Sequence, residues 1–155
     1  MNQNIQSKIK DKIQEDISPT RNLSGIHLKI VFGIAILWTF FQLWYASPFP
    51  FWFNFGMFKG LPARAIHLGF ALTLAFLIFP AVRGKKISVI DILISIVAAF
   101  CCLYIYFFYD DLVNRGGILL VKEIFGFKVP VELTIGAIGI VILLEATRRA
   151  IGLPL

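Results

Sequence analysis

Hydrophobic residues along this chain are gathered into four long runs, with short polar stretches between them. The runs cover residues 28–47, 64–82, 89–108 and 131–146. A helix that crosses the hydrocarbon core of a bilayer needs about 20 mostly apolar residues, and each run reaches or approaches that length. The pattern predicts an all-α membrane protein in which residues 26–155 form one domain of four transmembrane helices.

The first 25 residues differ from this pattern because they are polar and mixed in charge. They have neither the short apolar core nor the small-residue cleavage site of a secretory signal, so we expect the first hydrophobic run to serve as the insertion signal. Isoleucine recurs at every fourth position: Ile5, Ile9, Ile13 and Ile17. A helix with such a narrow apolar stripe lies on a membrane surface. A frayed cytoplasmic tail is the equal alternative.

The amino-acid composition also indicates a membrane protein. Hydrophobic residues make up 58% of the 155 residues and charged residues 15%, and the mean hydropathy is +0.81. Four spans use most of the chain, which leaves no room for a sizeable soluble domain. The net charge is +6, but the lysines and arginines are dispersed along the loops rather than clustered. We interpret them as topology signals and contacts with membrane lipids, and we expect no nucleic-acid partner.

The positions of Lys and Arg predict that both termini are cytoplasmic. With the N-terminus inside, ten of these residues lie on the cytoplasmic side and five lie outside, in agreement with the positive-inside rule. Glu145 precedes two of the inner arginines by three and four residues, the spacing of ion pairs on a helix. The clearest inner markers are Arg83, Lys85, Lys86, Arg148 and Arg149.

Both outer loops carry apolar segments that we expect in the membrane interface. The first holds six aromatic residues between Phe49 and Phe58, and its prolines disfavour a long helix. This segment is either an anchor in the aromatic belt or a docking surface for another protein, to which Trp52 and Phe53 would belong. The second loop holds a short amphipathic piece, ILLVKEIFGFKVP, at residues 118–130.

Four polar residues on the outer side are further candidates for a partner surface. Arg64 and His67 are three residues apart and share one helix face. A hydrogen-bonded interfacial histidine is favoured over a proton relay, because no acid accompanies His67 in its run. Asp110 and Asp111 form an acidic patch, and adjacent carboxylates offer too few oxygens for a dedicated metal site. We predict no catalytic, cofactor-binding or metal-binding residue.

Few polar residues interrupt the hydrophobic runs. Gln42 lies near the outer end of its run, where we expect it to reach lipid headgroups rather than a neighbouring helix. Asp91 falls in the first turn of the third run, where it complements the helix dipole and meets Lys85 or Lys86. We therefore expect four spans without a buried charge pair.

Small residues predict where helices approach one another. Cys101 and Cys102 are adjacent and point about 100° apart on a helix, so they are expected to be buried thiols rather than a disulfide. Small residues recur along the third run at Ser95, Ala98, Ala99 and Cys102, a face suited to close helix packing. Gly136 and Gly139 give the fourth run a smooth patch.

Three segments together resemble a known family. They are RAIHLGFAL at residues 64–72, FYDDLVNRGG at 108–117 and LEATRRAIGLPL at 144–155. In this order they resemble the four-helix small-subunit part of tripartite ATP-independent periplasmic (TRAP) transporter permeases. The likeness is to the type in which four and twelve helices are fused and which works with TAXI-type solute-binding proteins. It extends from about residue 25 onward.

The resemblance implies a non-catalytic scaffold in a bacterial or archaeal cytoplasmic membrane. Its implied partners are a large permease part, a periplasmic solute-binding protein and membrane lipids. Ion-driven symport of an organic-acid-like solute would be carried out by the large part, so no ion-binding or substrate-binding residue is transferred. In fused relatives a sequence like RRAIGLPL leads into a further membrane segment. We therefore expect this chain to be either a fragment or a separately encoded subunit.

Two other functions stay open from the sequence. The first is a small four-helix membrane enzyme that uses His67, Asp110 and Asp111, all on the outer side. The second is a stand-alone membrane adaptor that docks a periplasmic protein through the outer loops. The enzyme would need a nucleophile, a base and an orienting acid within hydrogen-bond reach of one another.

Overall fold

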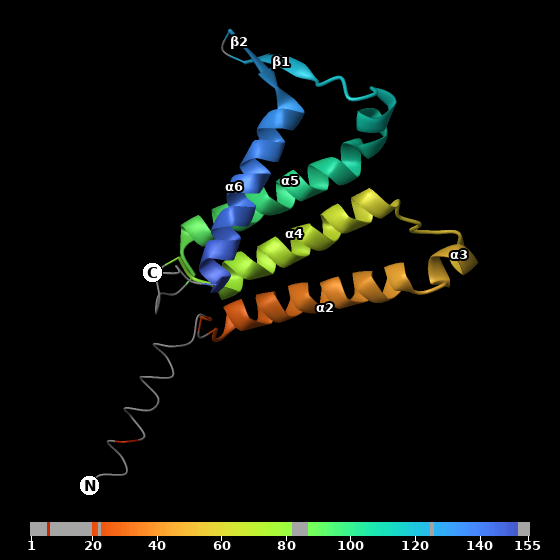
Figure 1. Cartoon of the computed structure of the whole chain (residues 1–155). Helices are drawn as coiled ribbons and strands as arrows, with labels where there is room; N and C mark the ends of the chain where they lie inside the picture. Colours follow the sequence, from red (N-terminus) through yellow and green to blue (C-terminus); the bar gives the residue numbers. More distant parts are fainter. Residues whose placement is uncertain (1–5, 7–19, 22, 82–86, 125, 152–155) are drawn as a thin grey trace.

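The computed structural model describes residues 6, 20–21, 23–81, 87–124 and 126–151. Its elements follow the chain as α2 (Ile26–Ala46), α3 (Phe49–Phe53), α4 (Gly60–Ile78), α5 (Val89–Asn114), β1 (Val121–Ile124), β2 (Phe127–Pro130) and α6 (Val131–Ile151). Figure 1 shows α2, α4 and α5 side by side, with α6 crossing them and the hairpin of β1 and β2 standing off the bundle.

Three of these helices are long and apolar enough to cross a membrane: α2, α4 and α5. They make this a multi-pass membrane protein, because most of their large apolar side chains are exposed on the outside of the bundle, where lipid or another membrane protein must cover them. The fourth predicted run lies within α6. Every 18-residue stretch of α6 contains at least three charged residues, which sets it apart from the other three.

The core of the bundle lies where α4, α5 and the second half of α6 meet. Phe76 is fully buried there, at 0% exposure, and packs with buried side chains from all three helices: Leu72, Ala98, Cys102, Ile142 and Ala146. Helices α4 and α5 approach closely at Gly69, where a Cβ atom would lie 3.2 Å from the Cβ atom of Cys102. The predicted small-residue face of α5 is therefore confirmed as a packing face.

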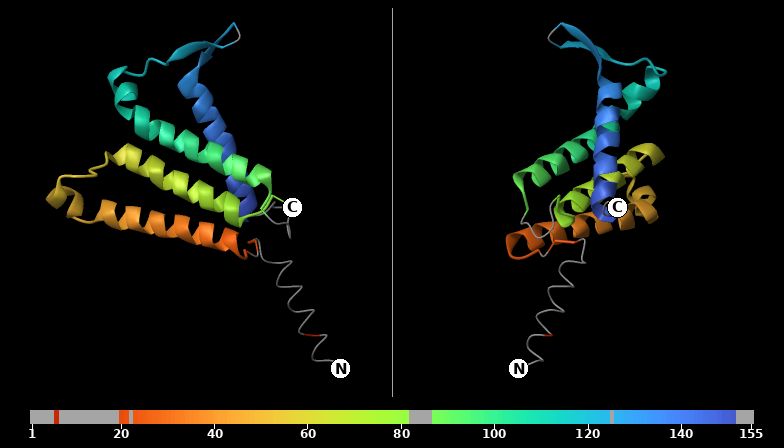
Figure 2. Two further views of the ribbon diagram at one scale, coloured as in Figure 1. Left: turned by 180° about the vertical axis from the view of Figure 1, so that it is seen from behind. Right: turned by 60° about the vertical axis from the view of Figure 1, so that its left-hand side comes forward.

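Helix α2 packs on the opposite side of α4 from α5 (Figure 2). Val31 of α2 forms a second buried cluster with Leu74 and Leu77 of α4. This cluster is smaller than the core between α4 and α5, and α2 has only one buried residue along its length. One face of α2 therefore holds α4, and the rest is left for lipid or a partner.

Helix α6 contacts the bundle through its C-terminal half. Its buried residues are Ile142, Ala146 and Arg149, whereas Leu133 near its start is 61% exposed. Toward its N-terminus α6 diverges from α5, as both views of Figure 2 show. The bundle thus has a closed end, where α2 begins and α6 ends, and an open end, which carries α3 and the hairpin (Figure 1).

The hairpin corrects the all-α prediction. Residues 121–130 form two antiparallel strands, with Val121 opposite Pro130 and Ile124 opposite Phe127. The pairing is fixed where the hairpin meets α6, because the backbone N–H of Val131 donates to the carbonyl of Leu120 at 2.9 Å. This second outer segment was expected as an amphipathic piece of unspecified structure, and its apolar residues favour strand pairing.

Three helices extend at one end by four or more residues beyond the predicted spans. Helix α4 begins at Gly60 rather than residue 64, α5 continues to Asn114 rather than residue 108, and α6 continues to Ile151 rather than residue 146. Asp110 and Asp111 therefore belong to the last turns of a helix and not to a loop. The four isoleucines of the expected tail helix and the markers Arg83, Lys85 and Lys86 lie outside the described residues.

Candidate functional site

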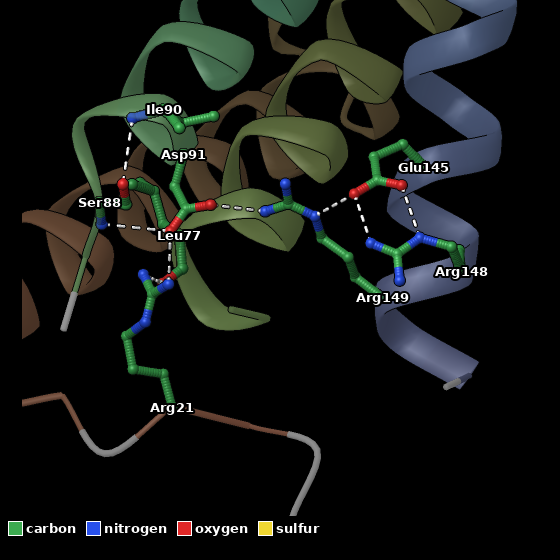
Figure 3. A network of polar contacts seen from close by, with 8 residues as sticks. All are labelled: Arg21, Leu77, Ser88, Ile90, Asp91, Glu145, Arg148 and Arg149. Atoms are coloured by element: carbon green, nitrogen blue, oxygen red, sulfur yellow. Dashed lines mark hydrogen bonds and ion pairs between the residues drawn. The ribbon is translucent and has the colours of Figure 1, made fainter. Parts of the chain in front are cut away.

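A cluster of five charged residues lies at the closed end of the bundle. We call it the Asp91 cluster; its members are Arg21, Asp91, Glu145, Arg148 and Arg149 (Figure 3). They come from the segment before α2, the start of α5 and the end of α6. Arg21, Asp91 and Arg149 are buried, and buried charges are found paired because an unpaired charge away from water is costly.

The start of α5 fixes the position of Asp91. Ser88 is the N-cap of the helix, and its hydroxyl oxygen accepts a hydrogen bond from the N–H of Ile90 at 3.4 Å. Asp91 stands three residues later and accepts the N–H of Ser88 at 3.2 Å. This reciprocal arrangement is a capping box. It holds the carboxylate at the helix N-terminus, where a negative charge is stabilised.

Two arginines bind the two oxygens of Asp91. Arg21 donates from its Nη2 to Oδ2 at 2.6 Å, and Arg149 donates from its Nη1 to Oδ1 at 2.7 Å. All three side chains are at most 4% exposed. Arg21 also donates to the carbonyl of Leu77 at 3.1 Å, and its backbone N–H donates to the carbonyl of Ile78 at 2.9 Å. Asp91 thereby connects the segment before α2, the end of α4, the start of α5 and the end of α6.

Glu145 extends the cluster along α6. It accepts from the Nε of Arg149 at 2.8 Å and from two nitrogens of Arg148 at 2.7 Å each. The guanidinium of Arg149 also lies over the ring of Phe76, with 4.9 Å from its central carbon to the ring centroid. Arg149 therefore satisfies two carboxylates and an aromatic face at once, for which its planar fork of donors is suited.

This cluster of ion pairs has a structural role: it holds together the chain segments that contribute to it. Three guanidinium groups meet two carboxylates, and both oxygens of each carboxylate already accept hydrogen bonds. The predicted Glu145 pairs with Arg148 and Arg149 are confirmed. The expectation of spans without a buried charge pair is wrong. Asp91 was expected to meet Lys85 or Lys86, and among the described residues it is Arg21 and Arg149 that bind it.

At the open end, a second set of ion pairs holds the loops. Lys59, just before α4, pairs with Asp110 near the end of α5, and this hydrogen bond raises the pKa of the Lys59 ammonium above its usual value. Arg115 pairs with Glu132 at 2.7 Å. Glu132 also accepts the N–H of Leu120 at 2.8 Å, which joins the hairpin to the first turn of α6.

His67 is the best-connected polar side chain between α2 and α4. Its Nδ1 accepts a hydrogen bond from the indole N–H of Trp38 at 3.3 Å and also contacts the side-chain amide of Gln42. The prediction of a hydrogen-bonded histidine is thus confirmed. The favoured placement of Gln42 among headgroups is wrong, because its amide meets a neighbouring helix.

The aromatic loop presents an exposed apolar surface. Trp52 is 72% exposed and Phe53 is 67% exposed, both on the short helix α3. The ring of Trp44, near the end of α2, contacts three rings of the loop: Phe49, Phe53 and Phe55. A Cβ atom on Gly56 would lie 2.8 Å from the indole nitrogen of Trp44, so this loop folds tightly over the end of α2.

An apolar cleft of about 250 Å³ opens between α4, α5 and the first part of α6. Its walls include Leu68 on α4, Cys101 and Tyr104 on α5, and Gly136 and Gly139 on α6. A Cβ atom on either glycine would have nothing within 4 Å. The smooth patch predicted on the fourth run therefore faces open space, and the cleft offers apolar walls but no row of polar groups along which a solute might pass.

Within the part of the chain that the structure describes, no three residues of the metal-binding types gather to hold an ion. Cys101 and Cys102 are buried free thiols, as predicted. His67 and Asp110, two residues of the enzyme alternative, each have a different partner: His67 binds Trp38 and Gln42, whereas Asp110 binds Lys59.

No family model matches this chain. Comparison with curated proteins and with solved structures likewise finds no match.

Sequence reasoning missed two residues of the site, Arg21 and Trp38. Arg21 stands 70 positions from Asp91, and no local pattern links them. The available signal was Asp91 itself, since a carboxylate in an apolar run needs a cationic partner. Trp38 offered a weaker signal, as an indole N–H in a membrane helix also needs an acceptor.

Proposed function

We propose that this chain is the small membrane part of a TRAP-type secondary transporter, with α6 as a fourth span and both termini in the cytoplasm. It acts as a scaffold that braces a large permease part in a bacterial or archaeal cytoplasmic membrane. The large part carries out ion-driven symport of an organic-acid-like solute, which a periplasmic binding protein of the TAXI type delivers. The resemblance in three segments is the origin of this proposal.

The length and charge pattern of α6 support the fourth span. At 1.5 Å per residue, its 21 residues extend about 31 Å, close to the thickness of the hydrocarbon core. Its charged residues lie at the two ends, with none between Glu132 and Glu145. Within a bilayer the charges at both ends lie near the interfaces, where they are tolerated.

The observation that carries the proposal is the open cleft. A membrane helix with two glycines on one face is built for close contact with another helix. Here those glycines face a cleft that the described residues leave unfilled. One end of the bundle is held by the Asp91 cluster, and the other has an open apolar cleft. This arrangement supports a scaffold whose cleft is filled by a helix of a larger membrane partner.

The open end supports the second partner. Under this orientation it faces the periplasm, and there the exposed rings of Trp52 and Phe53 stand with the carboxylates of Asp110 and Asp111. Aromatic side chains are enriched where proteins dock. These residues are the proposed contact of the solute-binding protein.

Purification from native membranes tests the scaffold. A tagged chain isolated in mild detergent is expected to bring down a large permease protein, or to be covalently joined to one. Gly136→Leu places a bulky side chain in the cleft and is expected to lower the recovered partner strongly. Gly33→Leu is the matched control, because Gly33 on α2 also has nothing within 4 Å. Reproducible isolation of the wild-type chain without any membrane partner would refute the proposal.

A further inference from the structure

Arg64 and His67 leave hydrogen-bond donors unused on one face of α4. The indole of Trp38 can only donate a hydrogen bond, and its 3.3 Å contact with the Nδ1 of His67 is met by a ring whose Nδ1 is unprotonated. In the neutral ring the proton then resides on Nε2. Within the described part of the chain, neither this N–H nor the guanidinium of Arg64 has an acceptor, and both side chains are exposed.

The depth of the two residues makes these free donors costly. Helix α4 has 19 residues and a length of about 28 Å, which nearly matches the hydrocarbon core. Arg64 is four residues and His67 seven residues from the first residue of the helix, which places them about 6 Å and 10 Å along its axis. Polar groups facing lipid at such depth have no water to bind and are strongly disfavoured.

The pair also stands next to the cleft. Leu68 is a wall residue of the cleft, directly follows His67 in the chain and lies one helical turn from Arg64. His67 faces α2, where its Nδ1 meets Trp38 and Gln42, whereas Arg64 shares a face with Leu68. A helix seated against Gly136 and Gly139 and passing over Leu68 would therefore meet Arg64 first, and an acceptor on its side nearer α2 would also reach the exposed edge of His67.

We propose that Arg64 and His67 together bind a carboxylate of the large permease part, on the membrane helix that fills the cleft. The inference rests on the proposed function and adds the chemistry by which the partner is recognised. A carboxylate neutralises Arg64 and offers a second oxygen to the His67 Nε2–H. A lipid phosphate is the poorer candidate, because it lies above the depth of His67.

Crosslinking in native membranes tests the identity of the occupant. A photoreactive benzoyl-phenylalanine in place of Leu68 is expected to capture a peptide of the large part that contains Asp or Glu within one helical turn of the crosslink. Capture of lipid alone, or of a membrane helix without an acid at that level, overturns the inference. Only one residue is changed, so the result does not depend on removing either donor.

Co-purification tests whether the Arg64 cation and the His67 donor contribute to binding of the large part. Arg64→Gln is expected to lower the recovered large part about tenfold or more, and His67→Phe to lower it less, because a hydrogen bond to a charged group is lost in each case. Arg64→Lys keeps the cation and should retain most of the partner. Lys122→Gln, which removes an exposed cation of the hairpin, is the matched control and should change nothing.

The outcomes separate this inference from the proposed function. If the wild-type chain recovers the large part and Arg64→Gln recovers it equally well, the carboxylate contact is wrong while the scaffold stands. If the wild-type chain recovers no membrane partner, both are wrong. If Arg64→Gln and Lys122→Gln lower recovery to the same degree, the effect is one of general charge and the specific contact is refuted.

Discussion

The two halves of α6 are in opposite situations, although they belong to one helix. In the C-terminal half, Ile142, Ala146 and Arg149 are buried against α4 and α5. Arg149 also pairs with Asp91 of α5, which in turn binds Arg21. In the N-terminal half, Gly136 and Gly139 border the open cleft, and Glu132 is held by Arg115 and by the N–H of Leu120. The C-terminal half of α6 is held by charged residues of this chain, whereas the N-terminal half leaves a cleft that a further helix would fill.

The difference shows which end of the bundle is packed by contacts within this chain and which end is left for a partner to cover. A buried ion pair is costly to form and still more costly to break, because the remaining partner is then an unpaired charge. Such a contact specifies one arrangement of the segments that it joins. An apolar cleft has no such specificity and is filled by whatever helix fits it. Substitutions at the two ends should therefore affect different properties.

The largest effect is expected at the centre of the Asp91 cluster. Asp91→Asn leaves Arg21 and Arg149 buried without their shared carboxylate, which should lower the free energy of unfolding by about 3–5 kcal/mol. Thermal unfolding in detergent measures the change. Asp111→Asn is the matched control at the exposed end of α5 and should shift the midpoint little. Equal thermal unfolding midpoints for the two variants would show that the Asp91 cluster does not stabilise the fold.

A sharper comparison uses two neighbouring arginines. Arg149→Met removes two charged hydrogen bonds but leaves both carboxylates with another arginine, so we expect a loss of about 2–3 kcal/mol in unfolding free energy. Arg148→Met removes only an exposed partner of Glu145 and should have little effect. The two variants differ in burial and not in residue type. If Arg148→Met destabilises as much, the exposed pair and not the buried one holds α6.

The cleft allows a comparison of two glycines. Gly69→Leu forces a side chain against Cys102 in the closed α4–α5 contact and should cost roughly 1–3 kcal/mol of stability. Gly139→Leu points into open space and should leave the stability of the isolated chain nearly unchanged. Chemical unfolding of both purified variants measures the difference. Strong destabilisation by Gly139→Leu would mean that the cleft is closed in the isolated chain.

The smallest effect concerns the helix cap beneath the cluster. Ser88→Ala removes the hydroxyl that accepts the Ile90 N–H, and loss of such a cap costs about 1 kcal/mol. Ser88→Asp is the conservative variant and should restore the cap while it adds a negative charge beside Asp91. A midpoint for Ser88→Ala that matches the wild type would mean that the arginines alone position Asp91.

Sequence predicted well what depends on local hydrophobicity. The helices α2, α4 and α5 follow from runs of about 20 apolar residues, and the packing face of α5 follows from small residues four apart. Their ends were less well placed, because the polar turn that carries Asp110 and Asp111 is helical without being apolar. The hairpin was missed because its two short strands are recognised by their pairing, which is not visible in either strand alone.

The candidate site was predicted only in part, for a physical reason. The pairs of Glu145 with Arg148 and Arg149 are local and follow from helix geometry. The contacts of Asp91 with Arg21 and Arg149 join residues 70 and 58 positions apart, and any of several basic residues at that end had an equal claim. Tertiary packing selects among them, and a single sequence does not record that choice.

The position of Arg149 also has a consequence for biosynthesis. A chain made from its N-terminus exposes Arg21 and Asp91 to one another while α6 is still being synthesised. Until residue 149 has left the ribosome, one oxygen of Asp91 lacks its arginine, and the first three helices wait in the membrane with an incompletely neutralised carboxylate. Completion of the last helix therefore supplies the second arginine of Asp91 and with it the contact that closes this end of the bundle.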